Sequence, residues 1–314
     1  MISRPTLIGA LVVVELAIMG GAFRAIGIGS GPPRPLSVHA WSWHPGAVAE
    51  AATPGGLDRT FTTGPAPHVV LDVHDVRVRI DAVPGAAVRV VDSAQRHGWV
   101  TGRVMPAQAE RTADGVRITV PSGEGIVSLG WFERELRVTV PPGATVEVAA
   151  TSRVDAAGLR SRLMVRSTDG SIHVRDHRGE VDVQTNDGRV ELTDVLGTSV
   201  LAQTRDGSLT LTRVAADRLD ARTDDGRISA DAVRLVDGAL TTRDGRVRVG
   251  YTPDSTATVN VRTADGRITL PDGGSTDGED GDRHNRTVRL GSGQGRFEVS
   301  SGDGSISITP GAQV

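Results

Sequence analysis

Apolar and polar residues alternate with a period of two along most of the chain from His68 onwards. Four early segments show the alternation: VVLDVHDVRVRIDA (69–82), AAVRVVD (86–92), DGVRITVP (114–121) and ELRVTVPPGATVEVAAT (135–151). Alternation places the apolar residues on one face of a β-strand, and the many β-branched residues favour that conformation. Pro-Gly and Asp-Gly turns separate the segments, and no amphipathic helical pattern lies between them. The region is therefore predicted to be all-β.

From residue 159 to residue 310 the alternation repeats around an Asp-Gly pair, in phrases such as TNDGRVEL, QTRDGSLTL, TDDGRISA, TRDGRVRV and TADGRITL. The pairs follow one another in steps of about 19 residues, with one double step at the end. A fixed period of this length is the signature of a stacked repeat. The aspartates of the pairs are Asp169, Asp187, Asp206, Asp225, Asp244, Asp265 and Asp303.

Alignment on the Asp-Gly pair gives columns of like residues. The positions two and four after the glycine are apolar, and so is the strand before the turn, which places one apolar face on each repeat. A single repeat cannot bury that face alone, so the repeats are expected to stack. The position two before the aspartate is always a hydroxyl residue: Ser167, Thr185, Thr204, Thr223, Thr242, Thr263 and Ser301.

Two architectures fit these repeats. Asp-Gly between alternating strands is also a strong hairpin signal, which would give an antiparallel β-meander. The column-wise identity favours coils stacked in parallel, where each residue meets its own equivalent one strand spacing away. We predict a β-solenoid, similar to a parallel β-helix, of about 19-residue coils, with a strand-rich region before it and a transmembrane or signal helix at the N-terminus.

Two roles are open for the Asp-Gly column. In the structural role, the aspartate accepts a backbone hydrogen bond and the glycine adopts the positive φ of a tight corner. In the functional role, the aspartate ladder binds calcium or a cationic ligand. Aspartates one strand apart repel by about 0.9 kcal/mol per pair even in water. The arginines expected to neutralise the ladder are Arg189, Arg227, Arg246, Arg267, Arg205 and Arg243.

The chain is predicted to have four parts: a membrane anchor or signal segment (1–29), a Pro/Gly-rich linker (30–67), an N-terminal β region (68–158) and the Asp-Gly solenoid (159–310). The apolar stretch Leu7–Ile28 is about long enough to span a bilayer, although Glu15 and Arg24 interrupt it. As an uncleaved anchor it predicts a single-pass cell-membrane protein with an extracytoplasmic C-terminal domain. Cleavage near Gly20 would instead give a secreted protein.

Composition excludes several classes of function. The chain has no cysteine, which rules out disulfides, thiolate metal sites and cysteine nucleophiles. Its net charge is −3, and arginine is the only strongly basic residue type. No basic run is present, so we predict no nucleic-acid partner.

Three further groups of residues carry weaker signals. Ser171, His173, Asp176 and His177 contain the residue types of a nucleophile system or a metal site, but alternation turns His173 outward and leaves the two histidines without a common pocket. The acidic stretch 272–282 does not follow the order of a calcium-binding loop and is expected to be a solvated insertion. Trp99 and the Trp131-Phe132 pair are expected to pack on the stack or cap one end. No catalytic residue, cofactor or metal site is predicted.

The chain resembles a bacterial family of adhesin-like proteins of unknown function. The residues that carry the resemblance are LRVTVPPGATVEVAAT, STDGSIHV, TNDGRVEL and the closing SGDGSISI. It implies a β-solenoid in the cell envelope, outside the cytoplasmic membrane, and supplies no catalytic residues.

We therefore expect a non-enzymatic envelope surface protein that acts as a binding or scaffolding module. Its expected partners are the membrane, through the N-terminal helix, and a protein or polysaccharide ligand. One alternative is a polysaccharide-active β-helix enzyme, for which Asp224-Asp225 and Asn186-Asp187 are the nearest carboxylate candidates. The other alternative is a regulatory partner in the envelope stress response.

Overall fold

The computed structural model of the protein describes residues 56–271 and 284–311, without the side chains of residues 96–103 and 124–131. All of these residues belong to one compact unit, Ala49–Val314. They form strands and turns, and the described part of the chain contains no helix. Accordingly, it contains no helix long and apolar enough to cross a membrane. The predicted anchor Leu7–Ile28 lies outside the described residues.

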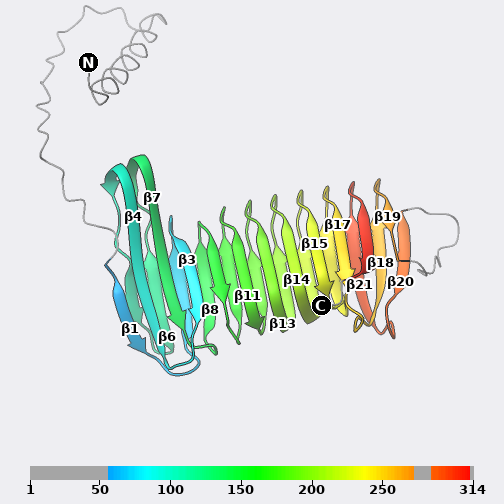
Figure 1. The fold of residues 1–314 in the computed structure, drawn as a ribbon, viewed down its shortest axis with the longest axis horizontal. Helices are drawn as coiled ribbons and strands as arrows, with labels where there is room; N and C mark the ends of the chain where they lie inside the picture. The colour runs from blue at the N-terminus through cyan, green and yellow to red at the C-terminus, as the bar shows by residue number, and fades with distance from the viewer. Residues whose placement is uncertain (1–55, 272–283, 312–314) are drawn as a thin grey trace, which may run out of the picture. The chain divides into compact units, whose positions relative to one another are not determined.

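Strands account for most of the described chain (Figure 1). In chain order they are β1 Asp58–Thr62, β2 His68–Val73, β3 Arg77–Ala82, β4 Ala87–Arg103, β5 Gln108–Arg111, β6 Gly115–Val120, β7 Glu124–Val140, β8 Thr145–Ala150, β9 Val154–Ala157, β10 Leu163–Ser167, β11 Ile172–Arg178, β12 Val181–Gln184, β13 Val190–Gln203, β14 Leu209–Arg222, β15 Ile228–Val233, β16 Asp237–Thr242, β17 Val247–Tyr251, β18 Ala257–Thr263, β19 Ile268–Thr269, β20 Asn285–Arg289, β21 Gly295–Ser301 and β22 Ile306–Pro310. β1 lies within the stretch that the sequence suggested was linker.

The repeats form two-stranded coils that stack in parallel. On one face of the stack β8, β10, β12 and the second half of β13 are neighbours, and on the other face β9, β11 and the first half of β13 are neighbours. Both halves of β13 pair in parallel with β14. The pairing joins equivalent residues of successive repeats, such as Ile172 with Val190 and Val190 with Leu209. The stack is thus solenoid-like, and the antiparallel meander is wrong for the repeats.

Between the two faces lies the apolar core. The residues that alternation turned inward are buried: Ile172, Val190, Leu209, Ile228 and Val247 are each 0% exposed. The intervening residues of the same strands face solvent. The period of two in the sequence therefore sets which half of every strand enters the core.

The turn after the first strand of each repeat is held by the hydroxyl column. Thr223, which is buried, shows the pattern: its Oγ1 accepts a hydrogen bond from the Gly226 N–H at 3.1 Å and donates to the Gly207 carbonyl of the neighbouring coil at 2.9 Å. Equivalent bonds join Thr204, Thr242 and Ser301 to the coils beside them. Each of these four hydroxyls thus closes its own turn and ties it to the adjacent coil. One such buried bond contributes about 1 kcal/mol.

The glycine of the repeat is needed for close packing between coils, which corrects the expectation of a positive φ. None of the repeat glycines in the described turns has a positive φ. A Cβ placed on Gly226 would instead lie 1.7 Å from the carbonyl oxygen of Gly207, in the coil beside it. Only glycine allows the turns to stack at this separation.

The left-handed corner lies elsewhere in five of the coils, within or directly after the strand that follows the turn. Gly158, Asp176, Asp194, Arg213 and Ala232 stand there with φ between 47° and 79°. Asp176 and Asp194 are residue types that tolerate this conformation, whereas Arg213 and Ala232 adopt it at a cost. Arg213 also pairs with Asp194 of the neighbouring coil, at 2.8 Å between Nη2 and Oδ2.

Coil order at the N-terminal end does not follow the chain. The first coil, β2 and β3, lies between the coil of β6 and β7 and the coil of β8 and β9. Antiparallel strands then close the end, since β4 adds to β7, β1 adds to β4 and β5 adds to β6. In Figure 1, β4 and β7 also extend beyond the neighbouring strands.

A buried ion pair holds the base of the β4–β7 hairpin. Arg134 donates to both carboxylate oxygens of Asp92, at 2.9 and 2.6 Å, and to the Met105 carbonyl at 2.9 Å. The two charged side chains are only 3% and 2% exposed. The side chains of Trp99 and Trp131, expected to cap an end, are outside the description, although their backbones lie in β4 and β7.

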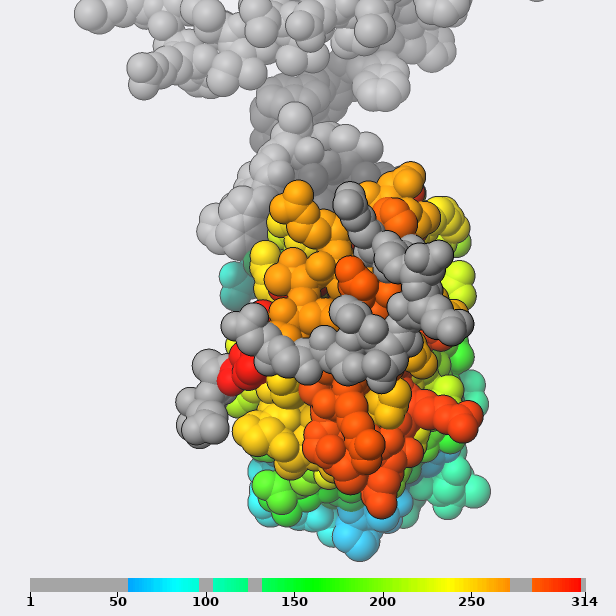
Figure 2. Space-filling model, turned by 90° about the vertical axis from the view of Figure 1, so that its right-hand side faces the viewer, coloured from blue at the N-terminus to red at the C-terminus, as the bar shows by residue number. Residues whose placement is uncertain are grey.

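The C-terminal end has the same inversion. The last coil, β21 and β22, pairs with β16 and β17 on one side and with β18 and β19 on the other. In Figure 1 the red strands accordingly lie between the yellow and orange ones. β20 closes this end antiparallel to β18, and Figure 2 faces it, with orange residues in front. The last two coils therefore do not stack in chain order.

Candidate functional site

The seven aspartates of the repeat lie in one column at the turns, and all are exposed. Because the last two coils are inverted, the turn of Asp303 stacks on that of Asp244, and the turn of Asp265 lies outermost. No described backbone N–H donates to these carboxylates. The hydroxyl column instead accepts the backbone hydrogen bond that the sequence analysis assigned to the aspartates.

Neighbouring carboxylates of the column influence one another. The pKa of Asp206 is raised, first by desolvation at the turn and then by the charges of Asp187 and Asp225. Desolvation and the adjacent carboxylates of Asp225 and Asp303 raise the pKa of Asp244 as well. The column is therefore a line of mutual repulsion.

The arginines expected to neutralise the column do so only in part. Arg243 lies 3.8 Å from Asp225 and 3.6 Å from Asp224. Arg189 and Arg246 bond to serine hydroxyls on the next coil instead, at 3.1 and 2.9 Å. Among the described residues, no group of three or more His, Asp or Glu side chains is placed to hold a metal ion.

The two histidines noted in the sequence lie in different environments. His173 is half-buried on the outer face of β11, where its Nδ1 is 3.1 Å from Asp155 Oδ1 and 2.8 Å from Arg153 Nη2. His177 is 1% exposed and lies in register with Val195 of the next coil. They do not share a pocket, as the alternation predicted. The stretch 272–282 lies outside the described residues.

Burial lowers the pKa of His177 to about 4, although the nearby backbone of Glu180 and Ser161 and the charge of Asp176 oppose the shift. Neither ring nitrogen makes a hydrogen bond of good geometry with the described residues. His177 is thus a neutral ring buried in the core, in register with Val195 of the next coil.

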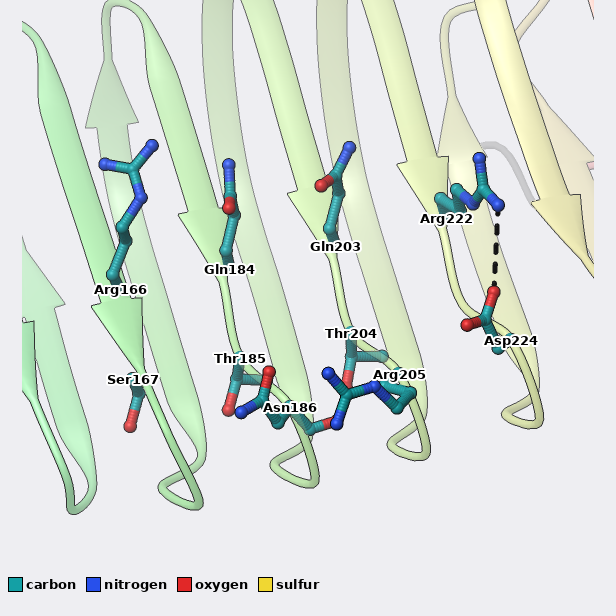
Figure 3. A pocket seen from close by; sticks show the side chains of 10 residues that line it. All are labelled: Arg166, Ser167, Gln184, Thr185, Asn186, Gln203, Thr204, Arg205, Arg222 and Asp224. Atoms are coloured by element: carbon teal, nitrogen blue, oxygen red, sulfur yellow. Dashed lines mark hydrogen bonds and ion pairs between the residues drawn. The ribbon is translucent and has the colours of Figure 1, made fainter.

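A groove of about 330 Å³ crosses the face formed by β10, β12, β13 and β14, beside the turns (Figure 3). Residues from successive coils line it, in register across the strands. The lining residues are Arg166, Ser167, Gln184, Thr185, Asn186, Gln203, Thr204, Arg205, Arg222 and Asp224. Sequence reasoning missed this groove, although the outward column Arg166, Gln184, Gln203, Arg222 was present in the alignment.

The hydroxyls of the groove are already used by the turns, but many of its longer side chains are not fully bonded. Within the described residues, the side chains of Asn186 and Gln203 have no hydrogen-bond partner. Gln184 donates through Nε2 to Asp182 Oδ1 at 3.0 Å, and Arg166 donates through Nη1 to the Met164 sulfur at 2.8 Å. Toward carboxylates, Arg166 and Arg222 make only long ion pairs, at 3.9 Å to Asp182 and 3.8 Å to Asp224, beyond hydrogen-bond distance. Figure 3 shows these side chains along the strands and at the turns.

The opposite face offers a contrast at its N-terminal coils, where two arginines pair closely with aspartates. Arg79 bonds to Asp81 at 2.8 Å, and Arg153 bonds to Asp155 at 2.8 Å. Desolvation favours a raised pKa for Asp155, but the hydrogen bonds and charges of Arg153 and His173 outweigh it and lower the pKa. These arginines therefore have short carboxylate partners, whereas Arg166 and Arg222 in the groove have only long ones.

For glycoside hydrolysis a pair of carboxylates must flank the scissile bond. Asp224 is the one carboxylate among the described residues that line the groove. Asp225 is exposed at the turn, directly after Asp224. Asp187 is exposed at the equivalent position of its own coil, directly after Asn186. The described lining of the groove thus holds one carboxylate and not a pair.

The fold and this surface define a stacked all-β repeat protein with a polar groove across its coils. The family model described as Toastrack DUF4097 matches residues 68–309, and the chain belongs to this family. The family resemblance found in the sequence is confirmed. A comparison with curated proteins finds no match.

Three solved structures are similar over most of their length. They are a "putative cell adhesion protein" from Clostridium sporogenes (11% identity, TM-score 0.29, 80% of this chain and 98% of that chain), a "putative adhesin" from Parabacteroides merdae (12%, 0.47, 81% and 95%) and a "putative adhesin" from Bacteroides fragilis (10%, 0.39, 81% and 96%). These low scores describe a loose overall superposition, from which no property of this chain follows.

Proposed function

We propose that the protein is a non-enzymatic surface protein of the cell envelope, an adhesin-like binding or scaffolding module outside the cytoplasmic membrane. The observation that carries the proposal is the groove on a regular stack, lined by the amide and guanidinium groups of successive coils. The apolar stretch Leu7–Ile28 supports attachment to the membrane as a single-pass protein.

Location is tested by labelling, because the chain has no cysteine. A single Thr198→Cys substitution, at an exposed position, is treated with a membrane-impermeant maleimide on intact and on broken cells. We expect equal labelling in both. Labelling in broken cells only would contradict the extracytoplasmic location.

Binding is tested by sedimentation of the full-length protein with purified fragments of the cell envelope of the source bacterium. We expect the protein to pellet with the fragments and the envelope polymers to keep their chain length. Failure to pellet would contradict a binding module. Shortened polymers would show an enzyme instead.

A further inference from the structure

The groove presents a row of hydrogen-bond donors at the spacing of the strands. Arg166 pairs in register with Gln184, Gln184 with Gln203, and Gln203 with Arg222. Since neighbouring strands lie about 4.8 Å apart, three steps make the row about 14 Å long. Because the row runs along the axis of the stack, an occupant that meets all of it must be an extended chain.

The occupant cannot bind by adding a strand. β12 is paired with β10 on one side and with β13 on the other, and β13 is paired on both sides in turn. Their backbone groups are therefore used within the sheet, and a peptide would find no free edge. Recognition must come from the side chains, which offer guanidinium and amide N–H groups to hydroxyl and carboxylate oxygens.

Charge decides between a neutral and an acidic occupant. The groove is lined by Arg166, Arg205 and Arg222 against one lining carboxylate, Asp224. Asp182 lies beside it, 3.9 Å from Arg166, and the arginines still outnumber these two carboxylates. Guanidinium groups bind carboxylates strongly and in a fixed geometry. No aromatic residue is among the described groove residues, so the stacking that holds neutral sugars is missing there.

We propose that this groove binds a linear polysaccharide that carries carboxylate groups, laid along the stack across β10, β12, β13 and β14. The proposal rests on the binding function proposed above and names its ligand. A chain of pyranose rings advances by about one strand spacing per ring, so that successive rings meet successive coils. Arg166 and Arg222 bind carboxylates at the two ends of the row, and Gln184 and Gln203 bind the rings between them.

The aspartate column beside the groove opposes such a ligand. Asp187 and Asp206 are exposed at the turns next to Asn186 and Arg205. Their charges repel an acidic polymer and limit its affinity. Removal of these charges should therefore tighten binding, whereas it should weaken binding if the carboxylates themselves were the contact.

The test is affinity electrophoresis of the full-length protein through gels that contain polygalacturonate, dextran or inorganic polyphosphate. We expect retardation by polygalacturonate, little by dextran, and less by polyphosphate than by polygalacturonate. The double variant Arg166→Gln, Arg222→Gln should lose about tenfold in affinity. The matched control Arg227→Gln, Arg248→Gln removes the same charge from exposed positions on the opposite face and should stay within about twofold. Asp187→Asn, Asp206→Asn should bind about twofold more tightly.

Equal retardation by dextran or stronger retardation by polyphosphate would overturn the proposal. So would an unchanged affinity of the arginine variant, or a weaker one of the aspartate variant. The four arginines and two aspartates are exposed or at the turn surface, so a thermal melt of each variant verifies that it is folded. If the protein pellets with envelope fragments but ignores polygalacturonate, only the ligand is wrong, whereas failure in both assays defeats the binding function as well.

Discussion

In the middle of the stack each coil packs on the coil that precedes it in the chain. At both ends the order is inverted: the first and the last coil of the chain are each the second in the stack, and their neighbour in the chain is outermost. The middle is held by repeated local devices: the hydroxyl bonds, the buried glycines and the apolar columns. The ends are held by singular ones, namely antiparallel strands and the Arg134–Asp92 pair. Repetition extends a stack, but its termination needs residues that occur once.

The segments at the two ends cover the surfaces that a stack of repeats alone would leave exposed. A stack of parallel coils would expose the apolar face and the backbone groups of its last coil, a site for aggregation. Placing the first and last coils inside gives each of them a neighbour on both sides. The outermost positions are filled by segments with shorter or antiparallel strands, such as β19 and β20.

The largest effect is expected at the N-terminal end. Arg134→Met leaves Asp92 buried without its partner and should cost about 3 to 5 kcal/mol of unfolding free energy. The double variant Asp92→Leu, Arg134→Met removes both charges and should recover most of the loss. Denaturant unfolding measures both, and a single variant as stable as the wild type would show that this end does not depend on the pair.

The same substitution in the middle and at the end separates the two regions. Gly226→Ala brings a Cβ within 1.7 Å of a carbonyl oxygen in a coil that has neighbours on both sides, and should cost about 3 kcal/mol. Gly266→Ala makes a similar clash at 2.0 Å, but no described strand pairs with the outer side of β19. The outer coil can shift, so we expect about 1 kcal/mol. Equal losses by thermal or denaturant unfolding would contradict the comparison.

His177 is an irregularity within the regular middle, and its effect depends on pH. Its pKa in the folded protein is about 4, against 6.5 when it is unperturbed. The unfolded chain therefore takes up the proton first, so stability should fall by roughly 3 kcal/mol as pH drops from 6.5 to 4. His177→Leu should remove this part of the acid sensitivity. The melting temperatures of the two proteins are measured between pH 6.5 and 4. If His177 were not involved, both would fall by the same amount over that range.

The smallest effect is expected at the left-handed corner. Ala232 has a φ of 51°, which glycine adopts without strain, so Ala232→Gly should stabilise the protein by about 1 kcal/mol. Ala230→Gly, two residues away in the buried strand, should destabilise it by a similar amount. A loss of stability in both variants would contradict the strain at Ala232.

The sequence was sufficient for the local features and insufficient for the order of the coils. Alternation identified the inward residues such as Ile172 and Val190, because burial follows the period of two. The columns predicted parallel stacking, because like residues meet only in that arrangement. The double step before Asp303 coincides with the inverted end. However, a local sequence pattern does not show which distant segments pair.

The aspartates that the sequence singled out lie at the turns, beside the groove that the structure adds as a candidate site. The sequence drew attention to the aspartates, whereas the groove is lined by the residues that precede them, such as Gln203 and Arg205. The role of glycine was also misplaced, since positive φ occurs at Asp194 and Arg213 on the other corner. Neither the groove nor the role of the glycine could be predicted, because a turn motif does not specify which groups of the neighbouring coil will approach it.

Hydrogen exchange of the full-length protein tests most directly whether the terminal coils lie inside the stack. If they do, the amides of β2 and β21 should exchange as slowly as those of β13, while β5 and β20 exchange first. Fast exchange of β2 and β21, with slow exchange of β6 and β18, would contradict the inverted order of the coils.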